Sequence, residues 1–191
     1  RVMDTVFSML AILVLSPVYL LAALRVKQSS PGPILYKQQR IGLFGKPFYI
    51  YKFRSMFVNA EQEGPALSSD EDPRITAWGK VMRKWRIDEL PQFFNIFLGD
   101  MSLVGPRPHM LKHTEHFAEL YKEYMIRHFV KPGLTGWAQV NGFRGEIRDN
   151  EFLQKRIEYD IWYMENWSLW FDMRIILLTI LVTIKGDQNA F

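Results

Sequence analysis

The chain contains no cysteine among its 191 residues. This absence excludes disulfides and thiolate metal sites, and it is typical of a protein that works in a reducing compartment. The sequence also has no internal repeat and no low-complexity tract. Its length suits one well-buried domain.

Positive charge is only slightly in excess. The chain has 24 Lys and Arg residues and 20 Asp and Glu residues, which gives a net charge of +4. A moderately basic chain favours phosphate-bearing partners or an anionic membrane surface. The excess falls short of a nucleic-acid signature, so we expect no nucleic-acid partner.

Long apolar runs are scarce, and the longest covers residues 6–24. Its length just suffices to span a bilayer core of about 30 Å. Ser16-Pro17 lies in its middle, where proline removes a helical hydrogen bond, and cations flank both ends at Arg1, Arg25 and Lys27. These features favour a re-entrant membrane helix that breaks at Ser16-Pro17 and returns to the same face. A plain span and a buried core helix are the alternatives.

The second apolar run, residues 175–184, would form a helix of only about 15 Å, which is too short to span. Rings with a polar tip favour the headgroup level of a membrane. We therefore expect amphipathic interfacial helices here, with a tryptophan-rich core as the alternative. The aromatic residues just before this run are Trp162, Tyr163, Trp167, Trp170 and Phe171.

The hydrophobic pattern predicts a mainly helical α+β domain with one small β-hairpin. The hairpin strands are expected at residues 34–41 and 48–53, and residues 137–140 are expected to be extended. Helices are expected at residues 76–86, 89–98, 109–128, 151–165 and 169–185.

The pair Asp88-Glu89 is the most informative feature, because two carboxylates follow closely on Arg83 and Arg86. Acids among cations suit a site where a divalent cation and an anionic substrate meet, as in phosphoryl transfer. We expect Asp88 to be the N-cap of a helix that ends at Gly99, and to stay ionised. The alternative is a simple capping aspartate followed by a solvated glutamate.

Other charged residues are candidates for the same site. Arg107 lies between two prolines and is suited to bidentate phosphate contacts, although a rigid loop arginine is often structural. Lys52 and Arg54 share one face of a strand, as a cationic clamp or as edge-strand charges. Asp160 and Asp172 have apolar and aromatic neighbours, so each is paired with a cation or functional.

Two further patterns carry less weight. His109, His113 and His116 fall close to one helical face with zinc-ligand spacing, but no matching fourth ligand is apparent. Residues 166–168 match the glycosylation acceptor pattern, and in a cysteine-free chain we interpret this as a chance match.

Several motifs in order carry a family resemblance, and they cover almost the whole chain. They are Ser16-Pro17, Pro31-Gly32-Pro33, Gln39-Arg40-Ile41-Gly42, 48–56, 72–76, Leu90-Pro91-Gln92, 99–108 and 131–142. With them the chain resembles the monotopic polyprenyl-phosphate phosphoglycosyl transferases of the bacterial sugar transferase family. One departure is Trp85-Arg86-Ile87, where many relatives have smaller polar residues.

The resemblance implies a two-step reaction. Asp88 would be the nucleophile and a Mg²⁺ ligand, attacking a UDP-sugar to release UMP and leave a phosphosugar on its carboxylate. Undecaprenyl phosphate would then take the phosphosugar. The resemblance assigns Glu89 to proton handling or acceptor activation, and Arg83 and Arg107 to phosphate binding. It gives further site roles to Lys52, Arg54, Asp160 and Asp172.

The resemblance also implies an organisation and a pathway. Residues 1–28 would form the membrane hairpin, and residues 29–191 the catalytic domain on the cytoplasmic face of the bacterial inner membrane. Segments 109–115 and 189–191 look like the branch that transfers glucose-1-phosphate for exopolysaccharide, capsule or colanic acid synthesis. Larger members carry an N-terminal multi-span region, expected to be absent here. Galactose and N-acetylated hexosamines stay open as the sugar, as does a homo-oligomeric state.

Two other functions remain open at this point. A glycosyl transferase that moves the sugar alone would release UDP instead of UMP. A non-catalytic membrane scaffold would use its basic face to bind anionic lipid or nucleic acid.

Overall fold

The structure, a computed structural model, describes residues 1–58, 72–145, 147 and 149–185. Segment 189–191, which carries part of the resemblance, lies outside these residues. The helices are α1 Val2–Val14, α2 Ser16–Ser29, α3 Ala77–Lys84, α4 Gln92–Leu98, α5 Leu111–Leu120, α6 Trp137–Val140, α7 Asn150–Glu165 and α8 Leu169–Lys185, with 3₁₀ turns η1 Leu43–Gly45, η2 Ile87–Glu89 and η3 Lys122–Phe129. The strands are β1 Leu35–Ile41, β2 Pro47–Phe53, β3 Ser102–Val104 and β4 Gly133–Thr135.

The first two helices form the expected helix-break-helix. Within the described residues no single helix is long and apolar enough to cross a membrane, whereas α1 and α2 meet that requirement as a pair bent by 62°. The break falls at Leu15, one residue before the predicted Ser16-Pro17, which instead opens α2. This shift follows from proline, which fits the first turn of a helix but disrupts the turn that precedes it.

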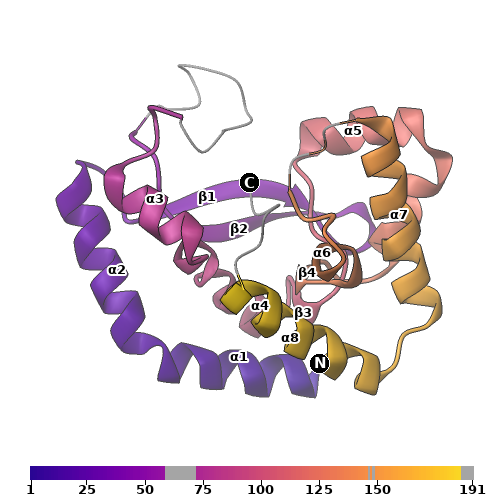
Figure 1. Ribbon diagram of the computed structural model, residues 1–191, viewed down its shortest axis with the longest axis horizontal. Coiled ribbons are helices and arrows are strands. Elements are labelled where there is room, and N and C mark those ends of the chain that lie inside the picture. The colour runs from indigo at the N-terminus through magenta and orange to yellow at the C-terminus, as the bar shows by residue number, and fades with distance from the viewer. Residues whose placement is uncertain (59–71, 146, 148, 186–191) are drawn as a thin grey trace.

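Polar contacts dock the helical pair on the rest of the protein. The two helices run along the outside of the molecule (Figure 1), with α1 packed against α4 and α2 against α3. The buried carboxylate of Asp4 accepts hydrogen bonds from Ser102 Oγ and Leu103 N, both at 2.9 Å. The Tyr19 hydroxyl donates to the carbonyl oxygen of Leu90 at 2.6 Å. The pair is therefore attached at β3 and at the turn before α4.

The outward face of the helical pair is apolar. Large side chains of α1 and α2 that are exposed include Val6, Leu10, Leu13, Val14, Leu20, Leu21 and Leu24. The aromatic segment before α8 is divided between the two expected environments. Tyr163 is buried in the core, whereas Trp162, Trp167 and Trp170 are exposed.

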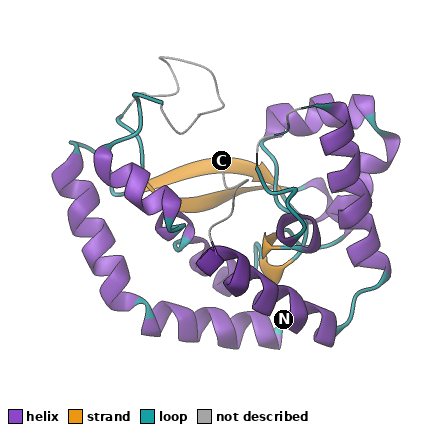
Figure 2. Ribbon diagram, viewed as in Figure 1, coloured by secondary structure: helices purple, strands orange, loops and turns teal. Residues whose placement is uncertain are grey.

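The strands form two small pairs surrounded by helices (Figure 2). Strands β1 and β2 make the predicted antiparallel hairpin, with Leu35 opposite Phe53. Strands β3 and β4 form a parallel pair that the pattern did not predict, because three residues show no periodicity. A Cβ at Gly133 would lie 2.1 Å from the backbone nitrogen of Gly105, so glycine permits this close approach.

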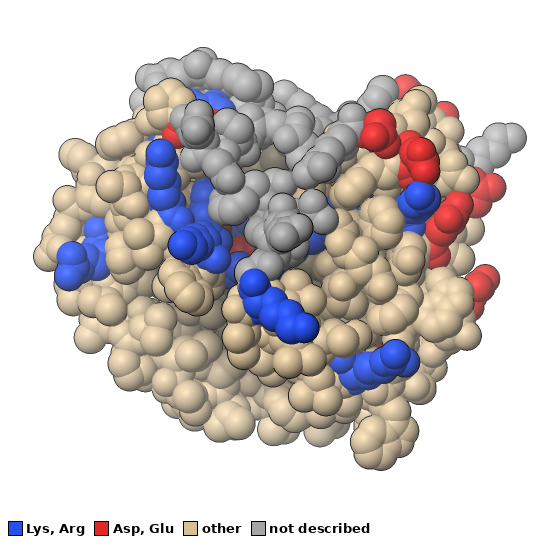
Figure 3. All heavy atoms as spheres, viewed as in Figure 1, with Lys and Arg blue, Asp and Glu red and all other residues tan. Residues whose placement is uncertain are grey.

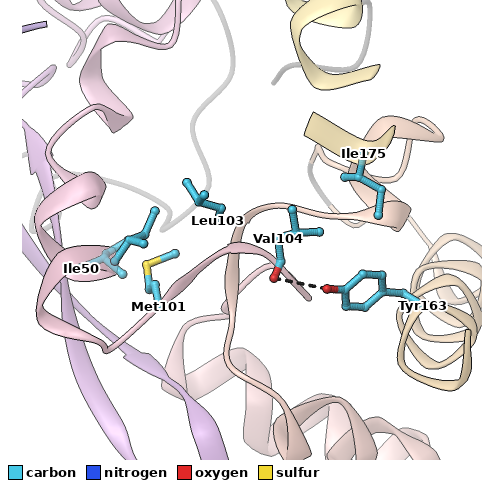
Figure 4. Packing of buried hydrophobic residues seen from close by; sticks show 7 residues of the cluster. Ile50, Met101, Leu103, Val104, Tyr163 and Ile175 are labelled. Carbon is cyan, nitrogen blue, oxygen red and sulfur yellow. Dashed lines mark hydrogen bonds between the residues drawn. The ribbon is translucent and has the colours of Figure 1, made fainter. Parts of the chain in front are cut away.

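The main core joins these pairs to the helices. It brings together β2, α4, β3, α7 and α8, and so fixes the strand that carries Lys52 and the helix that follows the acid pair. Its buried members are Ile50, Ile96, Met101, Leu103, Val104, Tyr163 and Ile175, most of which Figure 4 labels.

Three predicted elements were wrong in detail. The single helix expected at 109–128 is divided at Tyr121 into α5 and η3. The segment expected to be extended at 137–140 is the helix α6. The helix expected from Glu89 begins only at Gln92, because η2 and Pro91 come first. Gly99 ends α4 with φ of 99°, as predicted.

Candidate active site

The acid pair lies in the 3₁₀ turn η2, and Asp88 is not a helix cap. Arg86 precedes the turn with φ of 58°, a left-handed conformation that costs a non-glycine residue about 1 kcal/mol or more. The N-cap of α4 is Pro91, and no side chain caps it. Both carboxylates are nearly buried, with exposed fractions of 8% for Asp88 and 7% for Glu89. A solvated first-turn glutamate is therefore excluded.

Glu89 accepts hydrogen bonds from three cations. Its Oε1 lies 3.0 Å from Lys52 Nζ and 2.7 Å from Arg107 Nη2, and its Oε2 pairs with Arg144. Burial alone would raise the pKa of Glu89, but Arg107, Lys52 and Arg144 hold that pKa well below its usual value. Glu89 is therefore ionised and holds side chains from three separate segments together.

Asp88 has a different environment. Its carboxylate makes no hydrogen bond or ion pair with any residue in the described part of the chain. Burial raises the pKa of Asp88, with a further contribution from Glu89, and Lys52, Arg83 and Arg144 offset this only in part. The shift is opposite to the one expected at a helix N-terminus. No described residue therefore blocks either oxygen of Asp88 from a cation or an electrophile.

Of the two acids, Asp88 is the one whose carboxylate could hold Mg²⁺ among the residues that the structure describes. Among the described residues, no three or more His, Cys, Asp or Glu side chains are grouped so as to hold a metal ion. Mg²⁺ binds through one or two carboxylates and completes its shell with phosphate oxygens and water. Because three cations occupy Glu89, Asp88 is the carboxylate that would hold the ion.

The remaining predicted site residues divide into two groups. The structure brings Lys52, Arg83 and Arg107 to the acid pair, and Arg83 Nε also donates to Ser55 Oγ at 3.0 Å. It turns Arg54 away from the pair, because its guanidinium donates to the carbonyl oxygens of Ser30 and Pro31 at the end of α2.

The two later aspartates lie away from the acid pair as well. Asp172 accepts hydrogen bonds from Tyr163 Oη at 2.8 Å and Trp167 Nε1 at 3.1 Å. Asp160 forms a buried ion pair with Arg127 at 2.6 Å. Arg127 in turn donates to the carbonyl oxygen of Arg107 at 2.8 Å. Asp160 is therefore linked to the acid pair indirectly, through Arg127 and the backbone of Arg107.

His109 belongs to this buried network. Its Nδ1 lies 2.7 Å from Tyr124 Oη and 2.9 Å from Arg127 Nη1, and its Nε2 lies 3.1 Å from Arg156 Nη1. Burial and the surrounding guanidinium groups hold the pKa of His109 well below its ordinary value of 6.5. Both ring nitrogens are occupied, so His109 does not serve as a zinc ligand here. The side chains of the other two zinc candidates, His113 and His116, lie outside the described residues.

Acid is expected to destabilise the protein through His109. The unfolded chain binds a proton there near pH 6.5 and the folded chain does not, so stability is complete above pH 6.5 and falls as the pH drops. Between pH 7 and pH 5.5 this loss is about 1 kcal/mol. Urea unfolding of the His109→Gln variant should show a pH dependence smaller by that amount. An unchanged pH dependence would contradict the assignment.

Lys and Arg side chains are spread across the middle of the face shown in Figure 3, while Asp and Glu gather at one side. A buried cationic site around two acids suits an anionic substrate such as a diphosphate. In a comparison with known protein families, the bacterial sugar transferase family model matches residues 1–186.

The chain belongs to the bacterial sugar transferase family.

Named relatives of this sugar transferase are similar over nearly the whole chain. A UDP-glucose:undecaprenyl-phosphate glucose-1-phosphate transferase of Escherichia coli (strain K12) is 48% identical over 189 residues, which are 99% of this chain and 40% of that protein. A UDP-N-acetylgalactosamine-undecaprenyl-phosphate N-acetylgalactosaminephosphotransferase of Aeromonas hydrophila is 46% identical over 97% of this chain and 44% of its own length. An exopolysaccharide production protein of Rhizobium leguminosarum bv. phaseoli is 43% identical over 99% of this chain and 96% of its own length. This chain thus spans about 40% of the Escherichia coli relative.

Sequence reasoning missed one residue of this sugar transferase site, Arg144. It pairs with Glu89 across 55 positions of sequence. The only available signal was its place directly after the family motif at residues 131–142. No local periodicity marks a loop arginine, so its function emerges only from the folded contact.

Proposed function

We propose that this sugar transferase moves a sugar-1-phosphate from a UDP-sugar to undecaprenyl phosphate, with Asp88 as the nucleophile. The observation that carries the proposal is the contrast within the acid pair. Glu89 is held by three cations, whereas the Asp88 carboxylate beside it makes no hydrogen bond or ion pair with any described residue. A buried carboxylate with open lone pairs, next to cations, suits attack on a phosphate.

The reaction would proceed in two displacements at one phosphorus atom. An Asp88 oxygen attacks the sugar-linked phosphorus, and the bond from that phosphorus to the bridging oxygen breaks, so UMP leaves with the electron pair. An oxygen of undecaprenyl phosphate then attacks the same phosphorus. This step breaks the acyl phosphate bond, restores the Asp88 carboxylate and yields undecaprenyl-diphosphate sugar.

The cations would stabilise charge on the transferring phosphate. Arg107 and Arg144 contact Glu89 and lie beside Asp88, where planar donors can also meet phosphate oxygens. Mg²⁺ held by Asp88 would supply further neutralisation of the diphosphate. The low pKa of Glu89 favours a role in orienting these cations over the proton handling that the resemblance implies.

The apolar surfaces support membrane attachment. We propose that residues 1–28 form a re-entrant hairpin in the bacterial inner membrane, and that residues 29–191 form the catalytic domain on its cytoplasmic face. The 62° bend and the exposed apolar side chains of α1 and α2 support this hairpin. Trp170, which is 85% exposed, and Trp167, which is 59% exposed, support an interfacial position for α8. Such an anchor would keep the site near a lipid acceptor.

Glucose is the proposed sugar, and exopolysaccharide synthesis the proposed setting. The printed names of the Escherichia coli and Rhizobium leguminosarum relatives support these two choices. The Aeromonas hydrophila relative acts on an N-acetylated sugar at nearly the same identity, so N-acetylgalactosamine is the second candidate.

Incubation with Mg²⁺, undecaprenyl phosphate and a panel of UDP-sugars tests this function. We expect UMP and an undecaprenyl-diphosphate sugar, with UDP-glucose turned over fastest. Nucleotide release is read by liquid chromatography, and the lipid product by mass spectrometry. UDP as the freed nucleotide would show transfer of the sugar alone and overturn the proposal, as would binding of lipid without any turnover.

A further inference from the structure

Asn95 occupies an unusual place in the middle of α4. Asparagine is a poor residue for a helix interior, and an apolar side chain would suit the surrounding core better. Asn95 is nevertheless fully buried, with an exposed fraction of 0%. Its position therefore depends on the polar contacts that its amide makes.

The amide of Asn95 binds the backbone of β2. Its Oδ1 accepts a hydrogen bond from Tyr51 N at 3.0 Å, and its Nδ2 donates to Tyr49 O at 2.7 Å and also to Asp100 Oδ2 at 3.3 Å. The other edge of β2 pairs with β1, so these two groups belong to the edge that pairs with no other strand in the described part of the chain. The side-chain amide takes the place that a peptide group of a third strand would occupy.

This clamp joins the two segments that meet in the active site. Lys52 directly follows Tyr51 on β2, and Glu89 lies just before α4. The lysine ammonium and the glutamate carboxylate are 3.0 Å apart. A lysine side chain has a long flexible stem, so the placement of its backbone decides where the ammonium can rest.

We propose that Asn95 is a positioning residue for catalysis, whose amide fixes β2 against α4 so that Lys52 meets Glu89. The inference rests on the proposed function of the acid pair. It differs from a purely structural role in one respect: the effect of Asn95 on activity must pass through Lys52.

A double-mutant cycle tests this dependence in the full chain, with kcat/KM for UMP release from UDP-glucose as the readout. Asn95→Leu is expected to lower kcat/KM about tenfold, and Lys52→Met about a hundredfold. The double variant should match Lys52→Met to within about threefold, because Asn95 then has no lysine to position. A loss near the product of the two single losses, about a thousandfold, would overturn the positioning role.

Two further variants secure the result. Asn166→Leu removes an exposed amide that donates to Trp162 O at the end of α7, and it should leave kcat/KM unchanged. If Asn95→Leu does not fold, Asn95→Ala takes its place in the cycle with the same two outcomes, because alanine suits a helix interior and removes both contacts to β2 without adding a buried charge. Absence of UMP release from the unmodified chain would count against the proposed function, whereas multiplied losses count against the positioning role alone.

Discussion

Replacing Asp88 by asparagine is expected to lower kcat for UMP release at least about a thousandfold, the order of the loss when a covalent nucleophile is removed. The amide keeps the size of the side chain but provides no anionic oxygen to attack phosphorus. It also binds Mg²⁺ more weakly than a carboxylate does. Asp149→Asn is the matched control. Asp149 caps α7 by accepting from Phe152 N, and asparagine caps equally well, so activity should be unchanged.

A trapped intermediate gives a second measurement on the same residue. Enzyme mixed with UDP-glucose and no lipid acceptor, then quenched in denaturant, should carry the mass of one hexose phosphate on the peptide that contains Asp88. The Asp88→Asn variant should carry none. Near-normal turnover by that variant, or lipid product formed with no adduct under conditions that preserve acyl phosphates, would refute Asp88 as the nucleophile.

Replacing Glu89 by glutamine is expected to cost about 3–5 kcal/mol of unfolding free energy. The neutral amide leaves the partly buried cations Lys52, Arg107 and Arg144 without their shared anion. For a chain of this length the melting temperature should fall by roughly 10 °C, measured by thermal unfolding in detergent. The stability contributed by the low pKa of Glu89 is present above the ordinary glutamate pKa, so the comparison belongs near pH 7.

Glu151→Gln is the control for this stability effect. Glu151 pairs with Lys155 at 2.7 Å on the surface of α7, where their side chains are 76% and 50% exposed. Surface pairs of this spacing contribute only about 0.3–0.5 kcal/mol. Equal melting temperatures for the two variants would contradict the view that Glu89 holds the three cations together.

Local patterns in the sequence predicted the parts of the fold that rest on local physics. The β1–β2 hairpin, α7, α8 and the glycine end of α4 all follow from periodicity and from residues that favour particular backbone angles. The pattern was wrong at Asp88, because a left-handed Arg86 and a 3₁₀ turn replace the expected helix start. No local pattern predicts a left-handed conformation at an arginine, because non-glycine residues rarely adopt it.

The site shows the same division. Arg107, which two prolines hold in place, was predicted to lie close to the acid pair. The structure confirms this, because Arg107 donates to Glu89. Alternation along β2 placed Lys52 and Arg54 on one face, but the chain leaves the strand after Phe53, and Arg54 turns to the end of α2. Arg144 could not be found, since the contact that defines its role joins two distant loops.

The hydrogen bond from Tyr19 to the Leu90 carbonyl has a consequence for any attempt to make a version of this protein without its first two helices. The carbonyl belongs to the residue directly after Glu89, so cutting away the first two helices would loosen the turn that holds the acid pair at the same time as it removes the proposed membrane anchor. An inactive truncated form would then say nothing about whether chemistry needs a bilayer. Tyr19→Phe, which keeps the ring and the helices, separates these two causes.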